Sequence, residues 1–210
     1  MTEPLSMNRI IHSAVRRDVM RTEQALRTMA DGDRARAEQV RGAWRNLVRE
    51  LTHHHEAEDA NIWPFLERRG YDHAMLADME AEHAAMKHAL AAASSAIDSV
   101  VATPSAAQAA TAAQAVAACS EVVESHLVHE ERDLEPIAAA LEDDPEWKEM
   151  AKKLRPASIV DAANSLAWMQ DGAGERERSS LRSHVPGPVV SLLTLLLARR
   201  YRREVAPAWR

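Results

Sequence analysis

The chain has 210 residues, which suffices for one domain with an extension or for two small domains. Its 26 Lys and Arg residues against 32 Asp and Glu residues give a formal net charge of −6, which argues against general binding of nucleic acid through phosphate neutralisation. Six glycines and two tyrosines argue against an all-β fold, and the single cysteine excludes an internal disulfide and a cysteine-rich metal site.

Four long helices are expected first, and shorter segments follow them. Hydrophobic periodicity and turn signals place the long helices at residues 6–30, 34–66, 72–102 and 104–141. Pro64 predicts a kink or a stop near the end of the second helix, because proline lacks a backbone donor. Asp72 is the expected N-cap of the third helix, and Thr103 with Pro104 is expected to open the fourth.

A change of pattern near Pro145 divides the chain into two expected parts. Residues 1–145 are predicted to form an all-α four-helix bundle, and residues 146–210 a helical C-terminal extension. The extension contains an apolar run, residues 189–197, followed by an arginine-rich segment. We expect the extension to pack on the bundle or on a second subunit of a homo-oligomer. An amphipathic helix on an anionic membrane is the alternative, which we consider less favoured.

No targeting or membrane-spanning signal is visible. Residues 1–11 lack the apolar segment of a secretory signal, and no apolar run approaches the roughly 20 residues that cross a bilayer. A cytoplasmic location is therefore expected.

The ten histidines exceed the eight aromatic residues, which are five Trp, two Tyr and one Phe. Four of the histidines lie in phase with the apolar stripes of the four long helices: His12, His54, His83 and His126. In two helices a glutamate follows the histidine by four residues, Glu58 after His54 and Glu130 after His126. Residues four apart share one helix face, so both pairs are expected to point into the bundle.

A lone histidine on an apolar face is more often a hydrogen-bonded core residue than a ligand, and a metal-free helical interaction protein is one alternative. Six such side chains buried together are hard to explain by packing, because an unpaired buried carboxylate is strongly unfavourable. Metal cations at the centre would satisfy all six groups, and helix bundles are known to hold dinuclear sites of facing Glu and His residues.

Two segments, residues 54–64 and 126–136, repeat one pattern of His, Glu at +4 and Pro at +10. Together with Met79–His83 and the upstream His12, they make residues 5–141 resemble the hemerythrin-like (HHE cation-binding) family. The extension resembles that of some actinobacterial members. The resemblance implies an up-down four-helix bundle that holds two iron ions with a bridging oxide or hydroxide. The four in-phase histidines would be terminal ligands, and Glu58 and Glu130 would bridge the irons; zinc or manganese stays open, since ligand type alone does not fix the metal.

The chain departs from oxygen-carrying hemerythrins on the third helix. Those proteins have a further histidine four residues after the position of His83, where this chain has Lys87, and His88 is one residue out of phase. About two coordination positions then stay open on an octahedral count, which suits redox turnover better than reversible carriage. Four residues are candidates for a further ligand or for a hydrogen-bond partner of the ligands: Glu80, His55, His129 and Tyr71. His55 with Asp59 and His129 with Asp133 are expected either as pairs beside the ligands or as solvated surface pairs.

The leading functional hypothesis is a non-heme di-iron protein that binds and reacts with peroxide or dioxygen, with catalase-like activity. A module that binds or senses oxygen or nitric oxide is an alternative, and an iron storage protein is another. The expected partner is a small ligand such as peroxide, dioxygen or nitric oxide, not nucleic acid. If the protein is an enzyme, it is expected to be a di-iron oxidoreductase of the catalase or peroxidase type.

Overall fold

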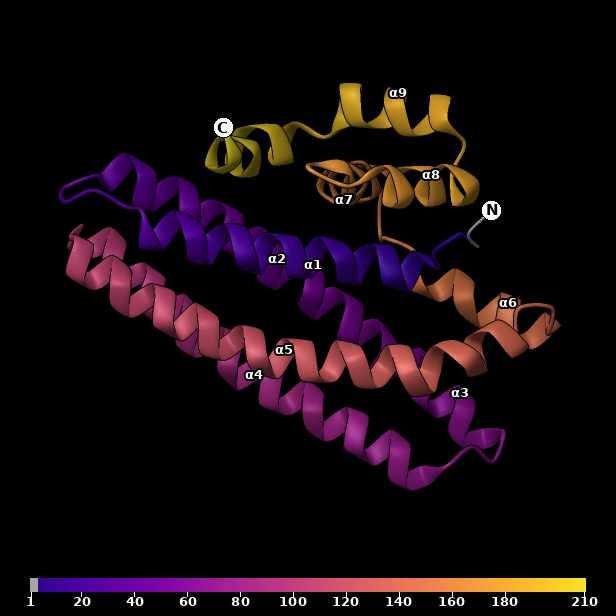
Figure 1. Cartoon of the computed structure of the whole chain (residues 1–210). Helices are drawn as coiled ribbons and strands as arrows, with labels where there is room; N and C mark the ends of the chain where they lie inside the picture. Colours follow the sequence, from indigo (N-terminus) through magenta and orange to yellow (C-terminus); the bar gives the residue numbers. More distant parts are fainter. Residues whose placement is uncertain (1–3) are drawn as a thin grey trace.

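The computed structural model describes residues 4–210, which form helices and turns without any strand. The long helices are α1 (Met7–Arg27), α2 (Arg34–Ala57), α4 (His73–Ala102) and α5 (Ala106–Ala140). They run alternately up and down, and each packs against two of the others in a four-helix bundle (Figure 1). The predicted all-α bundle with additional C-terminal helices is confirmed.

Side-chain caps define where the long helices begin. The Asp72 carboxylate accepts a hydrogen bond from the Ala74 N–H, as expected for an N-cap. The prediction that Thr103 and Pro104 open the fourth helix is wrong, because the Ser105 hydroxyl is the group that accepts from the Gln108 N–H. Thr103 instead ends α4, where its N–H still donates to the backbone of that helix.

The predicted second helix is interrupted earlier than Pro64. After α2, a π-helical turn (η1, Glu58–Ile62) leads into the short helix α3 (Trp63–Arg68). Trp63 N–H donates to the carbonyl of Glu58, five residues back, and the wide turn gives room to the Pro64 ring. The turn therefore carries Glu58 and Asp59 in a geometry that a regular helix would not give them.

Two apolar clusters fill the interior. The larger one lies among the four long helices and ends at Leu51, Met86 and Leu127. The smaller one gathers apolar residues of η1, α3, α4, α5 and α6 (Pro145–Ala151), with the Phe65 and Trp147 rings 5.5 Å apart edge to face. A layer of polar side chains separates these clusters.

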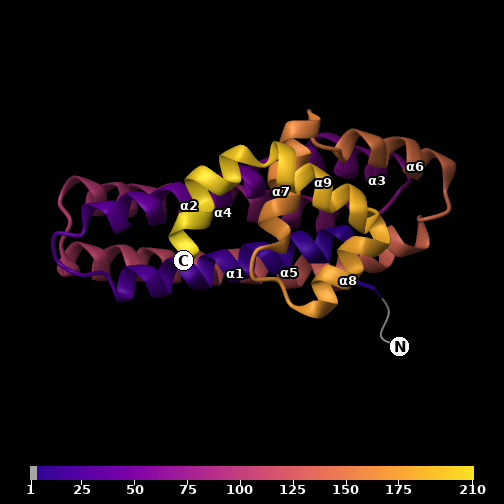
Figure 2. The same ribbon diagram turned by 90° about the horizontal axis from the view of Figure 1, so that it is seen from above.

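The rest of the extension crosses one face of the bundle. Its elements are η2 (Lys152–Leu154), α7 (Ile159–Gln170), α8 (Glu175–His184), α9 (Gly187–Leu197), η3 (Tyr201–Val205) and η4 (Ala206–Trp209). Helices α7 and α8 lie against α1, and η3 and η4 lie against α2, whereas α9 packs on the outside of α7 (Figure 2). Gly42 permits the close approach of η3, since a Cβ there would be 2.5 Å from the Glu204 carbonyl oxygen.

Trp168 anchors the extension in the core of the bundle. The residue is 2% exposed, and its Nε1 donates to Asp18 Oδ2 of α1 at 2.9 Å. A second link holds η3 to α7, where Asn164 Oδ1 accepts from the Tyr201 N–H. The extension thus shares its apolar core with the bundle, while the division at residue 145 stays a prediction.

The Asp18 carboxyl gives a pH-dependent prediction. Burial raises its pKa from 3.8 to about 6, although Trp168 donates to it and two arginines lie nearby. Because the folded protein then binds this proton more tightly than the unfolded chain, the stabilisation is complete below about pH 4 and is lost as pH rises through about 6. Relative to an Asp18→Asn variant, the unfolding free energy of the native protein should fall by about 3 kcal/mol from about pH 3 to pH 7. Urea unfolding of both proteins in matched buffers measures this difference, and a difference that does not change with pH would contradict the assignment.

The outer face of α9 is apolar and exposed, with Leu192 57% and Leu195 70% accessible. Oligomerisation through the extension stays a prediction. Over residues 4–210, no helix combines the length and the apolar character that crossing a membrane requires.

Candidate metal centre

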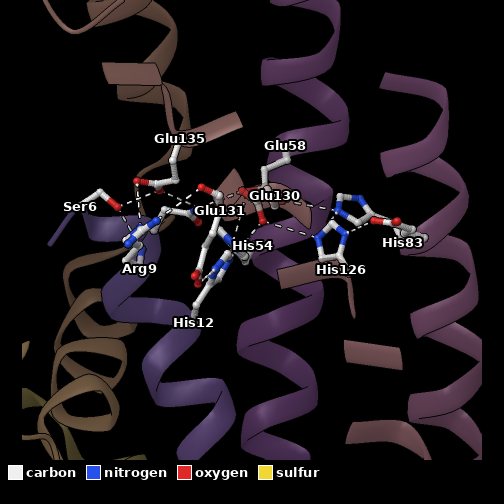
Figure 3. Close-up of polar contacts among 12 residues, drawn as sticks. Ser6, Arg9, His12, His54, Glu58, His83, His126, Glu130, Glu131 and Glu135 are labelled. Atoms are coloured by element: carbon white, nitrogen blue, oxygen red, sulfur yellow. Dashed lines mark hydrogen bonds and ion pairs between the residues drawn. The ribbon is translucent and has the colours of Figure 1, made fainter. Parts of the chain in front are cut away.

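The side chains of the six predicted ligands converge in the polar layer between the two apolar clusters (Figure 3). Helix α1 supplies His12, α2 and η1 supply His54 and Glu58, α4 supplies His83, and α5 supplies His126 and Glu130. Five of the six are buried residues, and the His54 side chain is 13% exposed. The side chains that the sequence periodicity placed on the inner faces of the helices therefore lie together in the folded protein.

The four histidines form two pairs whose ring nitrogens face each other. His12 Nε2 and His54 Nε2 lie 3.4 Å apart, and His83 Nε2 and His126 Nε2 lie 3.2 Å apart. We call these the α1–α2 pair and the α4–α5 pair.

Both glutamates lie between the two pairs. Glu58 Oε1 is 3.2 Å from His54 Nε2, and its Oε2 is 3.7 Å from His83 Nε2. Glu130 Oε2 is 3.1 Å from His12 Nε2 and 3.5 Å from His126 Nε2. Each carboxylate thus reaches one histidine of each pair, which is the arrangement expected of a group that bridges two cations.

Carboxylates outside this cluster determine which ring nitrogens carry protons. His83 Nδ1 donates to Asp59 Oδ1 at 2.7 Å, and His126 Nδ1 donates to Glu82 Oε2 at 2.9 Å. Because a carboxylate only accepts, each Nδ1 bears the hydrogen, and in the neutral ring Nε2 carries a lone pair. With both rings neutral, the two nitrogens of the α4–α5 pair present lone pairs to each other at 3.2 Å.

His12 has the same kind of outer partner, because its Nδ1 donates to Glu131 Oε1 at 3.0 Å. Arg16 Nη1 also donates to that oxygen, at 2.6 Å. Glu130 is held from the other side by Asn8, whose Nδ2 donates to Glu130 Oε1 at 2.9 Å. This bond leaves Glu130 Oε2 facing the histidines.

The donor set fits two cations. Glu58 Oε2 and Glu130 Oε2 are buried and accept no well-formed hydrogen bond, and the facing lone pairs repel each other. Two donors about 2.1 Å from one ion and at right angles to each other lie about 3 Å apart, close to the nitrogen–nitrogen and nitrogen–oxygen separations here. Cations between the donors would satisfy the lone pairs and the orphaned oxygens together.

Burial sets the charge states of the cluster. It lowers the pKa of His54 to about 3, which keeps this ring in the neutral form that ligates metals. Burial and the neighbouring Glu130 raise the pKa of Glu58 well above its ordinary value. Burial also acts to raise the pKa of Glu130, but the close approach of the His12 and His126 rings outweighs burial and holds that pKa well below the ordinary range.

The additional candidates from the sequence are placed differently. Glu80 is exposed on α4, and Tyr71 packs on the cluster of α3 and α6. His129 lies beside the cluster, with its Nδ1 donating to Glu82 Oε1 at 2.8 Å and its Nε2 3.1 Å from Asp133 Oδ2. The expected pairing of His129 with Asp133 is therefore present.

The expected pair of His55 and Asp59 is wrong. Asp59 Oδ1 accepts instead from His83 Nδ1 and from Trp63 Nε1, because the π-helical turn carries Asp59 toward α4. His55 is buried among the histidine rings, at 6% exposure.

Sequence reasoning missed Glu82, Glu131 and Asn8, and it paired Asp59 with the wrong histidine. Glu82 directly precedes His83, and Glu131 directly follows Glu130. The histidines to which they bind, His126 and His12, lie on other helices. No periodic signal within one helix could have identified them.

The comparison with protein families adds an independent finding. The family model described as the hemerythrin HHE cation binding domain matches residues 8–138. That range contains all six converging side chains. Comparisons with curated proteins and with solved structures gave no match.

Proposed function

Because the chain belongs to the hemerythrin HHE cation-binding family, we propose that it is a non-heme di-iron protein that binds and reacts with peroxide or dioxygen. Its proposed activity is catalase-like, the conversion of two hydrogen peroxide molecules into two water molecules and one dioxygen molecule. The observation that carries the metal assignment is the α4–α5 pair, whose two lone pairs face each other in a buried site.

The α1–α2 pair would hold one iron and the α4–α5 pair the other, with Glu58 and Glu130 bridging them. When bound, two irons with a bridging oxide or hydroxide supply redox equivalents and Lewis acidity. Neutral imidazoles and two carboxylates suit iron, but also zinc and manganese, so the metal itself belongs to the proposal.

The surrounding residues orient the ligands and limit the access of water. Asp59, Glu82 and Glu131 each hold one histidine in the tautomer that points Nε2 inward. The apolar clusters on both sides cover the polar layer, which strengthens electrostatic interactions inside it.

Glu82 and His129 also offer a path for protons. Both side chains line a surface hollow that runs along α5, to which α4 contributes Glu82 and α1 contributes Glu23. Glu82 accepts from His126 Nδ1 inside the bundle and from His129 Nδ1 nearer that surface. We propose that protons exchange between solvent and the site through this pair.

Oxygen release from peroxide tests the proposal. Protein loaded with iron should release dioxygen in an electrode assay, whereas protein loaded with zinc should not, because zinc has no redox chemistry. Glu58→Ala and His126→Ala should each lower kcat more than about 100-fold, beyond the usual cost of losing an outer hydrogen-bond partner. His73→Ala, at a histidine whose side chain is 72% exposed, is the matched control and should keep full activity.

Turnover that survives both ligand substitutions would contradict the assignment. Reversible binding of oxygen or nitric oxide by the iron-loaded protein, without peroxide turnover, would favour the binding or sensing alternative. Iron that exceeds two ions per chain and exchanges freely would favour storage.

A further inference from the structure

His55 is a fifth histidine in the cluster. It follows His54 on α2, but on a helix adjacent side chains point about 100° apart, so it faces a different part of the interior. Its ring lies 4.2 Å from the His83 ring in a nearly parallel stack, with an interplanar angle of 18°, and 5.1 Å from the His126 ring. His55 therefore lies closer to both rings of the α4–α5 pair than to the His54 ring, whose centroid is 5.4 Å away, although one of its nitrogens is also within 4.8 Å of ligand atoms of His54 and Glu58.

The polar end of His55 has no partner. Its Nε2 is buried without a hydrogen bond among the described residues, although a buried polar group is ordinarily paired. One ring nitrogen from each of His55, His83 and His126 lies within 4.8 Å of the others. Such a grouping of three buried imidazoles matches the way histidines gather around one metal ion.

Helix α4 offers no further ligand of its own at this position. Lys87, one turn after His83, is exposed, and so is His88. The space beside the α4–α5 pair is taken by the His55 ring from α2 instead.

We propose that His55 is the third histidine ligand of the metal position formed by the α4–α5 pair. This inference rests on the proposed two-metal function and extends it. The α4–α5 position then has three histidines and the α1–α2 position has two.

The competing interpretation is that His55 only stacks on His83 and positions it. His55→Phe separates the two, because phenylalanine keeps a ring for the stack but has no nitrogen to ligate. In the absence of metal this variant should be as stable as the native protein or more stable, since it removes an unpaired buried nitrogen.

Binding of cobalt(II) is the measurement, because its visible absorption becomes weaker as ligands are added and so reports coordination number. The native protein should bind two Co²⁺ per chain. In His55→Phe one site should keep its affinity, while the other should weaken more than about 100-fold and change its absorption, exceeding the effect of a lost positioning contact. His53→Phe, at the exposed neighbouring histidine, is the control and should match the native protein.

A second variant guards against misfolding. His55→Ala opens space for a free imidazole, and adding imidazole should restore both the affinity and the absorption spectrum of the weakened site. Two native-like sites in His55→Phe, or weakening without a spectral change and without rescue by imidazole, would overturn the role of His55. Native protein that binds no Co²⁺ and no iron would instead refute the proposed function itself.

Discussion

Removal of the metal is expected to lower the melting temperature of the protein by about 8–16 °C. A ligand present at a thousand times its dissociation constant adds about 4 kcal/mol of stability, and each 1 kcal/mol shifts the melting temperature of a protein of this size by about 2–4 °C. The structural reason is the cluster itself. Without cations, facing lone pairs such as those of His83 and His126 and the buried oxygens of Glu58 and Glu130 lack partners.

Calorimetry of iron-loaded, chelator-treated and reloaded protein measures this shift, which should reverse on reloading. Glu58→Ala is the matched control, because it removes a carboxylate shared by both metal positions and its melting temperature should respond much less to chelation. Identical melting curves for loaded and chelated native protein would show that the cluster does not depend on metal.

Trp168→Ala is expected to destabilise the protein by about 3–5 kcal/mol, the usual cost of truncating a large buried aromatic side chain. Trp168 is among the largest fully buried side chains, and it packs in the core that the extension shares with the bundle. Its loss would also leave Asp18 Oδ2, which is buried, without its hydrogen-bond donor.

Two variants calibrate this effect in chemical unfolding. Trp168→Phe keeps much of the ring but loses the hydrogen bond to Asp18, so it should cost less, about 1–3 kcal/mol. Ile159→Ala, on the same helix but 61% exposed, should stay within about 0.5 kcal/mol of the native protein. A Trp168→Ala variant as stable as Ile159→Ala would mean that the extension does not contribute to the stability of the bundle.

The helical fold and the six converging side chains were predictable because both depend on a period within one helix. Side chains three or four residues apart share a face, so His54 and Glu58 had to point the same way as the apolar residues around them. The start of α4 at Asp72 was predictable for a similarly local reason, because a side-chain oxygen caps backbone donors only two or three residues away.

The predictions from sequence were wrong where two local signals competed. Thr103 and Ser105 can both cap a helix, and only the backbone path of the connection brought Ser105 to the Gln108 N–H. Pro64 predicted a kink or a stop in the helix, but the structure has a π-helical turn that starts six residues earlier, at Glu58. That turn moved Asp59 away from His55 and into contact with His83.

By itself, then, the sequence determined which faces of the four helices turn inward and which polar side chains those faces carry. The tertiary structure alone decided which helices stand opposite each other, and therefore that Glu82 holds His126, that Glu131 holds His12 and that His55 joins the α4–α5 pair. The physical reason is the range of the interactions. Helical periodicity acts within a few residues of one segment, whereas the partners of a buried imidazole are set by the rotation and the register of helices packed side by side.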